Sequence, residues 1–252
     1  MIEVKGVTKR YGAQTVVDNV SVQIPKGGLT SIIGPNGAGK STLLSVISRL
    51  IRLDRGSVTV DGMDVDKTAS DTLAKRLSVL RQNTHITARL TVEDLVTFGR
   101  YPHSRGRTTH EDKGHIEAAL EYLELTDLRN RFLDELSGGQ RQRAFVAMVL
   151  CQDTDYVLLD EPLNSLDMKH AVAMMKRLRR ITDELDKTIV VVLHDINFAS
   201  CYSDQIVALK AGRLVHHGPP ASLMQPSILY DIYELDVQIE TIGSHPIGIY
   251  FT

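Results

Sequence analysis

A glycine-rich turn carries the residues with the clearest chemistry. It follows a short apolar run, leads into a periodic apolar segment, and has the spacing GxxxxGKS across Gly34, Pro35, Asn36, Gly37, Ala38, Gly39, Lys40 and Ser41. Glycines let backbone N–H groups approach phosphate oxygens without Cβ clashes, and a helix N-terminus adds partial positive charge. Lys40 adds a full charge near the β- and γ-phosphates, and Ser41 offers a hydroxyl to Mg²⁺. The turn therefore predicts a site for the phosphates of a nucleotide.

Two carboxylates end a second apolar run. Residues 156–159 are continuously apolar, as in a parallel strand buried on both faces, and Asp160 and Glu161 follow them. Ligands of open α/β sheets gather at the carboxyl ends of such strands. We expect Asp160 to reach Mg²⁺, directly or through water, and Glu161 to face the water that attacks the γ-phosphate. The alternative is a pair of ordinary surface acids.

A histidine follows a third apolar run, residues 189–193. At the end of a buried strand, His194 can hydrogen-bond the γ-phosphate or the attacking water. It can equally cap the next helix, and the residue alone does not separate these roles.

Paired glycines open another predicted helix. Ser137 and Gln140 have the spacing of a capping box, which is a purely structural explanation. Gly138 and Gly139 fit it less well, because glycine costs about 1 kcal/mol in a helix relative to alanine. The pair suggests that something approaches the backbone closely, such as an anion at the helix N-terminus.

Tyr11 and residues 101–107 give weaker indications of function. Tyr11, in the loop after the first strand, is either a core residue or a stacking platform for an adenine ring, and from the residue alone we favour the core. Residues 101–107 are polar and rich in turn formers, which favours a solvated loop.

Alternating and helical patterns predict the elements that position these residues. Residues 2–62 alternate as strands with one wet face, interrupted by a helix after Lys40. A capping box at Thr91 opens a helical region that also contains residues 111–123. The remaining predicted elements are a helix at 168–185, a hairpin at 206–215, a helix at 227–234, and strands at 237–242 and 247–251. The last three carry no recognisable chemistry.

Composition narrows the possible partners. The chain has 252 residues, is 42% hydrophobic, and has a formal net charge of −2. This balance offers no broad basic surface for nucleic acid, so no nucleic-acid partner is expected. Cys151 and Cys201 are isolated and are expected to be reduced thiols. No apolar run is long enough to span a bilayer, so a membrane role requires a partner.

The motif order resembles the ATP-binding cassette family across residues 2–218. The matching motifs are the glycine-rich turn, Gln82, the Leu136-to-Gln140 segment, the strand to Glu161, the Ser165-Leu166-Asp167 segment and His194. The resemblance implies an α/β fold: a P-loop NTPase core with a parallel sheet, an antiparallel β subdomain and an inserted α-helical subdomain. We expect the core and β subdomain at 1–82 and 153–218, the helical subdomain at 83–152, and a C-terminal extension at 219–252.

The same resemblance implies roles for individual residues. Tyr11 would stack on adenine, and the phosphates of ATP would be held by the residues from Gly34 to Thr42. Mg²⁺ would be bound by Ser41, Gln82 and Asp160. Catalysis would depend on Glu161 as general base or water-positioning group, on His194 as γ-phosphate sensor, and on Gln82 as a link from Mg²⁺ and water to the helical subdomain. Leu163 stands where many relatives carry threonine, which puts local packing beside the base in doubt.

In this family, the LSGGQ segment of one subunit caps the ATP held by the other. Ser137, Gly138, Gly139 and Gln140 would therefore contact nucleotide in a homodimer, with Asp167 in the loop that crosses to the partner. One copy of each half-site makes a C₂ homodimer the simplest assembly.

The segment from Thr91 to His103 looks like importer ATPases for ferric siderophores, haem and cobalamin. We expect an iron-chelate importer ATPase at the cytoplasmic face of the membrane, with separate permease subunits and an extracytoplasmic substrate-binding protein. The alternatives are a haem or cobalamin importer, an exporter, or a soluble cassette protein that acts on ribosomes or DNA. The soluble class usually carries two cassettes or basic insertions, and neither is present in this sequence.

Overall fold

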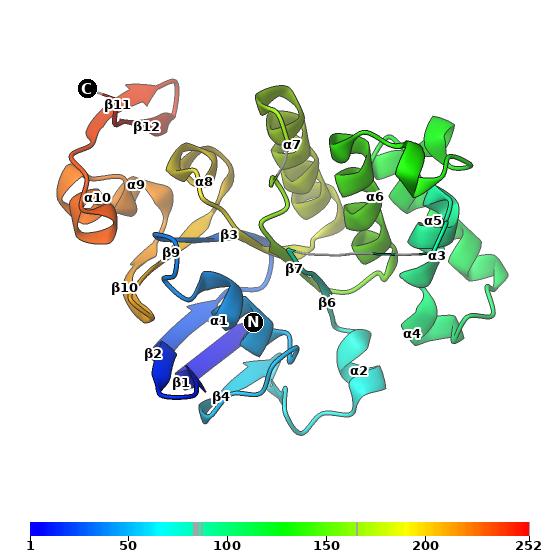
Figure 1. Cartoon of the computed structure of the whole chain (residues 1–252), viewed down its shortest axis with the longest axis horizontal. Helices are drawn as coiled ribbons and strands as arrows, with labels where there is room; N and C mark the ends of the chain where they lie inside the picture. The colour runs from blue at the N-terminus through cyan, green and yellow to red at the C-terminus, as the bar shows by residue number, and fades with distance from the viewer. Residues whose placement is uncertain (83–85, 87, 165, 252) are drawn as a thin grey trace. The chain divides into compact units, whose positions relative to one another are not determined.

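The computed structural model describes residues 1–82, 86, 88–164 and 166–251. Contacts divide the chain into two compact units, one of residues 1–68 with 188–252 and one of residues 69–187. Figure 1 shows the elements of both units in chain order. Within the described residues, no helix is long and apolar enough to cross a membrane. The subdomain boundaries given above remain a prediction.

An antiparallel sheet in the first unit confirms the alternating pattern at the start of the chain. Its strand order is β2-β1-β4-β5. The strands are β1 (Ile2–Tyr11), β2 (Gln14–Ile24), β4 (Arg55–Val60) and β5 (Met63–Asp64). Ile2 lies between Ile24 and Val60 in register, and all three side chains are fully buried. One face of this sheet is therefore apolar and the other is solvated, as period-2 alternation predicts.

A second sheet of the first unit has the order β10-β9-β3-β8. The strands are β3 (Gly28–Ile33), β8 (Thr188–Val192), β9 (Gln205–Lys210) and β10 (Arg213–Gly218). β3 is parallel to both β8 and β9, so the carboxyl ends of β3 and β8 lie at one edge, with Ile32 opposite Val192. α1 (Lys40–Ile47) follows β3 and α8 (Ile196–Tyr202) follows β8. The glycine-rich turn and His194 therefore follow neighbouring strands.

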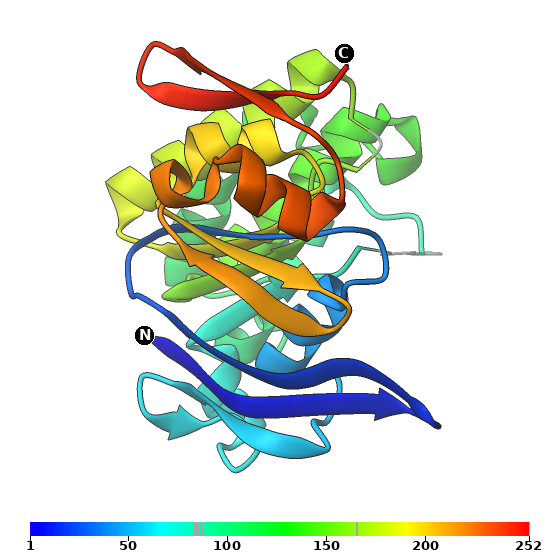
Figure 2. The same cartoon turned by 90° about the vertical axis from the view of Figure 1, so that its left-hand side faces the viewer.

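The C-terminal segment of the first unit contains the predicted helix and strand pair. Its elements are α9 (Pro220–Leu223), α10 (Pro226–Tyr233), β11 (Gln238–Ile242) and β12 (His245–Ile249). The two strands pair antiparallel, and β12 begins two residues before the predicted start. Figure 2 shows this hairpin lying over α8.

The second unit combines a parallel strand pair with helices. β6 (Leu77–Leu80) runs parallel to β7 (Tyr156–Asp160), and every residue of β7 is buried. Its helices are α2 (Ser70–Ala74), α3 (Val92–Phe98), α4 (Tyr101–Ser104), α5 (His110–Tyr122), α6 (Gly138–Cys151) and α7 (Met168–Leu185), with 3₁₀ turns η1 (Thr126–Leu128) and η2 (Leu133–Glu135). Capping boxes with both hydrogen bonds begin α3, α5 and α6, which confirms the predicted cap at Thr91.

The expected solvated loop at residues 101–107 is wrong for its first half, which forms α4. The preceding Gly99 packs so closely that a Cβ would lie 2.1 Å from the Met148 carbonyl oxygen. Arg100 is buried, and its Nε donates to Asp112 Oδ1 at 2.7 Å while Nη1 donates to the Cys151 carbonyl at 3.0 Å. The composition of residues 101–107 does not predict this helix, because a buried ion pair fixes the segment. The partner of that ion pair lies outside the segment.

Candidate functional site

The glycine-rich turn needs its glycines for two different reasons. Gly34 has φ 140° and Gly39 has φ 94°, and a Cβ on them would lie 2.0 Å from Leu209 O and 2.6 Å from Val16 O. Gly37 has φ 78°, and a Cβ on it would meet no described atom within 4 Å. Two glycines thus allow close packing, and the third allows a left-handed backbone.

Lys40 hydrogen-bonds to backbone carbonyls of the glycine-rich turn. Its side chain is buried, and Nζ donates to Gly34 O at 2.8 Å and to Pro35 O at 3.0 Å. Gly39 is the N-cap of α1 and has no side chain to cap the helix, so the first backbone N–H groups face outward with Ser41 and Thr42 in the first turn. Backbone donors, a helix N-terminus and an ammonium group in one turn form a site suited to phosphate.

His194 is exposed in the short loop between β8 and α8. The helix-capping alternative for this histidine is wrong, because Asp195 is the N-cap and its Oδ1 accepts from Asn197 N at 2.7 Å.

Tyr11 lies at the end of β1 and its side chain is 52% exposed. The core interpretation favoured from the residue alone is wrong. The Lys9 ammonium lies 5.6 Å from the ring centroid, within the range of a cation–π contact. The exposed ring retains the ability to stack on a planar base.

In the second unit, β7 delivers both carboxylates. Asp160 ends the strand and is only 7% exposed, so it is not an ordinary surface acid. Glu161 has φ 51°, an uncommon backbone conformation for a residue with a side chain. Its Oε2 accepts from Gln82 Nε2 at 2.6 Å and from Asn164 Nδ2 at 3.1 Å. The structure thus brings the predicted Gln82 and Glu161 together.

Asn164 was not found by sequence reasoning. Its only signal is its position, three residues after Glu161 in a turn where Asn164 N donates to Glu161 O at 3.1 Å. Two amide donors on one carboxylate oxygen fix the direction in which the carboxylate points.

The start of α6 confirms the capping box. Ser137 Oγ accepts from Gln140 N at 3.3 Å, and Gln140 Oε1 accepts from Ser137 N at 3.0 Å. A Cβ on Gly139 would lie 3.3 Å from the His170 ring and 3.5 Å from Leu166 Cδ2. One of the paired glycines therefore has a packing reason within the chain, while the approach of an anion to this backbone remains a prediction.

His170 is a second residue that sequence reasoning missed. It packs against Gly139, and its Nδ1 lies 2.7 Å from Asp167 Oδ1, which also accepts from the His170 backbone N–H at 2.8 Å. That backbone bond, more than the ring, lowers the pKa of Asp167. Asp167 is the N-cap of α7, so its carboxylate is already oriented by the helix start. Ser165 of the same segment lies outside the described residues.

The predicted metal ligands have suitable chemistry for Mg²⁺. Ser41, Gln82 and Asp160 offer hydroxyl, amide and carboxylate oxygens, the donors that this hard cation prefers. Among the residues that the structure describes, no group of three or more His, Cys, Asp or Glu side chains forms a metal site. Mg²⁺ commonly keeps several water ligands and binds the phosphates of its substrate, so it needs few protein donors.

Comparison with known proteins gives consistent matches. The family model described as ABC transporter matches residues 17–164. Petrobactin import ATP-binding protein YclP of Bacillus subtilis (strain 168) is 56% identical over 252 residues, 100% of both chains. Petrobactin import ATP-binding protein FatE of Bacillus anthracis is 51% identical over 250 residues, 99% of this chain and 100% of the relative.

A solved structure agrees with the fold. The dimeric, post-hydrolysis structure of the ATP-binding cassette MJ0796 bound to ADP and Pi matches with a TM-score of 0.77 and 30% identity, over 87% of this chain and 99% of that chain. The predicted α/β cassette fold is confirmed. The chain belongs to the ABC transporter family and is an ATP hydrolase of that family.

Proposed function

We propose that this chain hydrolyses ATP to power the import of a ferric siderophore through separate permease subunits. The observation that carries the proposal is the full-length identity to two petrobactin import ATP-binding proteins, 56% and 51%. These relatives make petrobactin the first siderophore to test. The retained motif residues support it, because a chain that powers transport must keep the groups that bind and hydrolyse ATP.

The phosphates of ATP bind to the turn from Gly34 to Thr42. Backbone N–H groups at the start of α1 and the Lys40 ammonium neutralise phosphate charge, while Tyr11 stacks on the adenine. Ser41, Gln82 and Asp160 would hold Mg²⁺, which would offset further charge on the transferred phosphoryl group. These residues supply binding and electrostatic stabilisation, which dominate phosphoryl transfer.

Glu161 orients the attacking water. The amides of Gln82 and Asn164 hold one carboxylate oxygen, which leaves the carboxylate in a fixed direction to accept a hydrogen bond from water. His194 hydrogen-bonds the γ-phosphate and thereby distinguishes ATP from ADP.

Two copies act together. Ser137, Gly138, Gly139 and Gln140 of one copy, with Asp167, complete the site that the phosphate-binding turn of the other copy begins. ATP binds the closed dimer more tightly than the open one, and hydrolysis removes that difference in affinity. We place the dimer at the cytoplasmic face of the membrane, on permease subunits that receive substrate from an extracytoplasmic binding protein.

A deletion strain tests the substrate class. Loss of the gene should abolish uptake of radioactive iron supplied as ferric petrobactin and leave amino-acid uptake unchanged, with recovery by the wild-type gene but not by Glu161→Gln. If the deletion strain still takes up ferric petrobactin but has lost the uptake of haem or cobalamin, the substrate is haem or cobalamin and not a ferric siderophore. Co-purification with ribosomes and not with a permease would support the soluble alternative.

A further inference from the structure

Helix α8 holds the C-terminal segment, residues 219–251, through two polar side chains. Asn197 Nδ2 donates to Gly248 O at 3.1 Å, and Gly248 N donates back to Asn197 Oδ1 at 2.7 Å. One turn later, Ser200 Oγ donates to Pro246 O at 2.6 Å. The helix side chains thus pair with the backbone of β12 much as a neighbouring strand would.

The contact is close as well as polar. A Cβ on Gly248 would lie 2.9 Å from Ile196 Cδ1, so β12 packs directly against the Ile196 side chain in the first turn of α8. Ile196 is two residues after His194. Any shift of β12 therefore acts on the helix start that fixes the end of the His194 loop.

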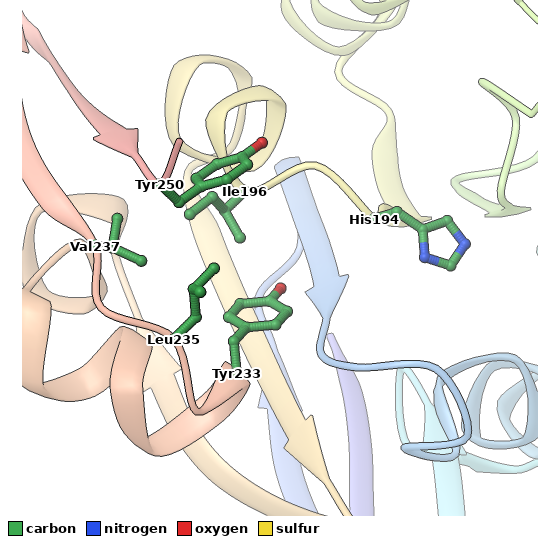
Figure 3. A pocket seen from close by; sticks show the side chains of 6 residues that line it. All are labelled: His194, Ile196, Tyr233, Leu235, Val237 and Tyr250. Atoms are coloured by element: carbon green, nitrogen blue, oxygen red, sulfur yellow. The ribbon is translucent and has the colours of Figure 1, made fainter. Parts of the chain in front are cut away.

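The segment also shares a pocket with this histidine (Figure 3). A cavity of about 180 Å³ is lined by His194, Ile196, Tyr233, Leu235, Val237 and Tyr250. Four of these six side chains come from the C-terminal segment. Burial raises the pKa of Tyr233. Among the described residues, no group forms a hydrogen bond of standard geometry with its hydroxyl.

A second attachment reaches the phosphate-binding turn through β9. Lys210 Nζ donates to the Asp231 carbonyl and pairs with Glu234 at 2.9 Å, and His216 Nε2 lies 2.8 Å from Asp231 Oδ2. α10 is thereby fixed to the β9–β10 hairpin. Leu209, the residue before Lys210, presents the carbonyl against which Gly34 packs.

We propose that the C-terminal segment positions His194 and the phosphate-binding turn for ATP hydrolysis, and that Asn197 is the positioning residue that connects the segment to His194. The inference rests on the role proposed for His194 at the ATP site. Asn197 does not touch the nucleotide; it acts by holding the helix that follows the histidine.

The test uses the full chain and measures ATP turnover, the KM for ATP and the melting temperature. Asn197→Ala should lower kcat about fivefold and leave KM within about twofold, because binding depends on the turn and on Lys40. Asn197→Asp, which keeps the acceptor for Gly248 N, should recover part of kcat. Gln238→Ala is the matched control: this amide bonds Glu240 at 2.8 Å within the segment and does not reach α8.

A double-mutant cycle separates positioning from general stability. In a His194→Ala background, measured under single-turnover conditions, Asn197→Ala should have no further effect. Equal fold losses in both backgrounds, or unchanged kcat in Asn197→Ala, would overturn the inference. Full turnover in His194→Ala alone would instead refute the role of His194, and the inference would fall with it. If Asn197→Ala does not fold, Ser200→Ala takes its place in the cycle.

Discussion

Glu161 combines a strained backbone with a carboxylate that is held in one direction. Its backbone is left-handed at φ 51°, and its carboxylate oxygen is held by amides from Gln82 and Asn164. Strained backbone of this kind persists where surrounding structure over-determines it, and such residues cluster at active sites. The carboxylate is thus oriented before substrate binds.

Replacing this carboxylate should separate binding from chemistry. Glu161→Gln should keep ATP affinity and lower kcat by about 100-fold or more, the range of a lost general base. Calorimetry and phosphate release measure the two effects. Glu111→Gln, on an exposed side chain of α5, is the control and should leave both unchanged. A variant that still turns over at the wild-type rate would remove Glu161 from the reaction.

Lys40→Ala should act on binding instead. The ammonium loses its charge-assisted hydrogen bonds to phosphate, worth about 1.5–3 kcal/mol, so the Kd for ATP should rise about tenfold or more. Calorimetric titration with Mg-ATP checks this, with the exposed Lys176→Ala as the control. Unchanged affinity would contradict the role of Lys40.

Residue chemistry was predictable where it depends on local spacing. The Lys40 turn and the Ser137 cap both emerge in the structure, whereas the contact between Gln82 and Glu161 joins residues 79 positions apart and was not predicted. Asn164 and His170 were missed because amide and imidazole groups in a loop have no distinctive spacing. Tyr11 was misjudged because exposure depends on the sheet edge at which its strand ends, and one residue cannot show that.

At the scale of elements, the phosphate-binding turn fits between β9 and β2 with almost no free volume at two of its glycines. Gly34→Ala places a Cβ 2.0 Å from the Leu209 carbonyl, a backbone atom that cannot move alone. We expect a loss of about 4 kcal/mol or more in the free energy of unfolding, the range of severe core changes. Gly37→Ala meets nothing within 4 Å and should cost about 1 kcal/mol from its left-handed backbone. Urea denaturation compares the pair, and equal losses would contradict the packing explanation.

The buried Arg100–Asp112 pair ties the start of α4 to α5. Burial alone would raise the pKa of Asp112, but the Arg100 guanidinium and the Thr109 groups lower it from 3.8 to about 2. The ionised carboxylate therefore contributes stability that is fully present above pH 3.8 and is lost as pH falls towards 2.

The variant Asp112→Asn should reveal this pH dependence of the unfolding free energy. It leaves a buried guanidinium without its counter-charge, so we expect a loss of about 3–5 kcal/mol at pH 7. The difference in unfolding free energy between wild type and variant should shrink between pH 4 and pH 2, as followed by urea titration at each pH. A difference that stays constant with pH would show that folding does not lower the pKa of Asp112.

Most elements were predictable because hydrophobic period and capping boxes are local. Both strand pairs at the ends of the chain and the capped helices α3 and α6 illustrate this. The helix at Tyr101 was not, since Arg100 meets Asp112 on another element and Gly99 meets the carbonyl of Met148. Long-range packing decides such segments, and no window of sequence contains both partners.

At the scale of the whole molecule, the proposed dimer predicts complementation. Lys40→Ala removes the phosphate-binding half of a site and Ser137→Ala weakens the capping half, so each homodimer should have little activity. A mixture should recover turnover, because one of the two sites in a mixed dimer carries both intact halves. The assay is ATP hydrolysis on titrating one variant into the other, with light scattering to measure mass. No recovery at any ratio would argue that each chain hydrolyses ATP alone.

The attachment of the C-terminal segment has a consequence for tolerance to sequence change. Asn197, Ser200 and Lys210 all reach backbone atoms of the segment, at Gly248, Pro246 and Asp231. Most substitutions in the segment keep the main-chain atoms that accept these hydrogen bonds. The side chains that point into solvent can therefore change without loss of the attachment. We therefore expect that a residue such as Ile242, which is 65% exposed, can be exchanged or labelled without loss of ATP hydrolysis. The segment is a natural place to attach a fluorophore that reports on the transporter at work.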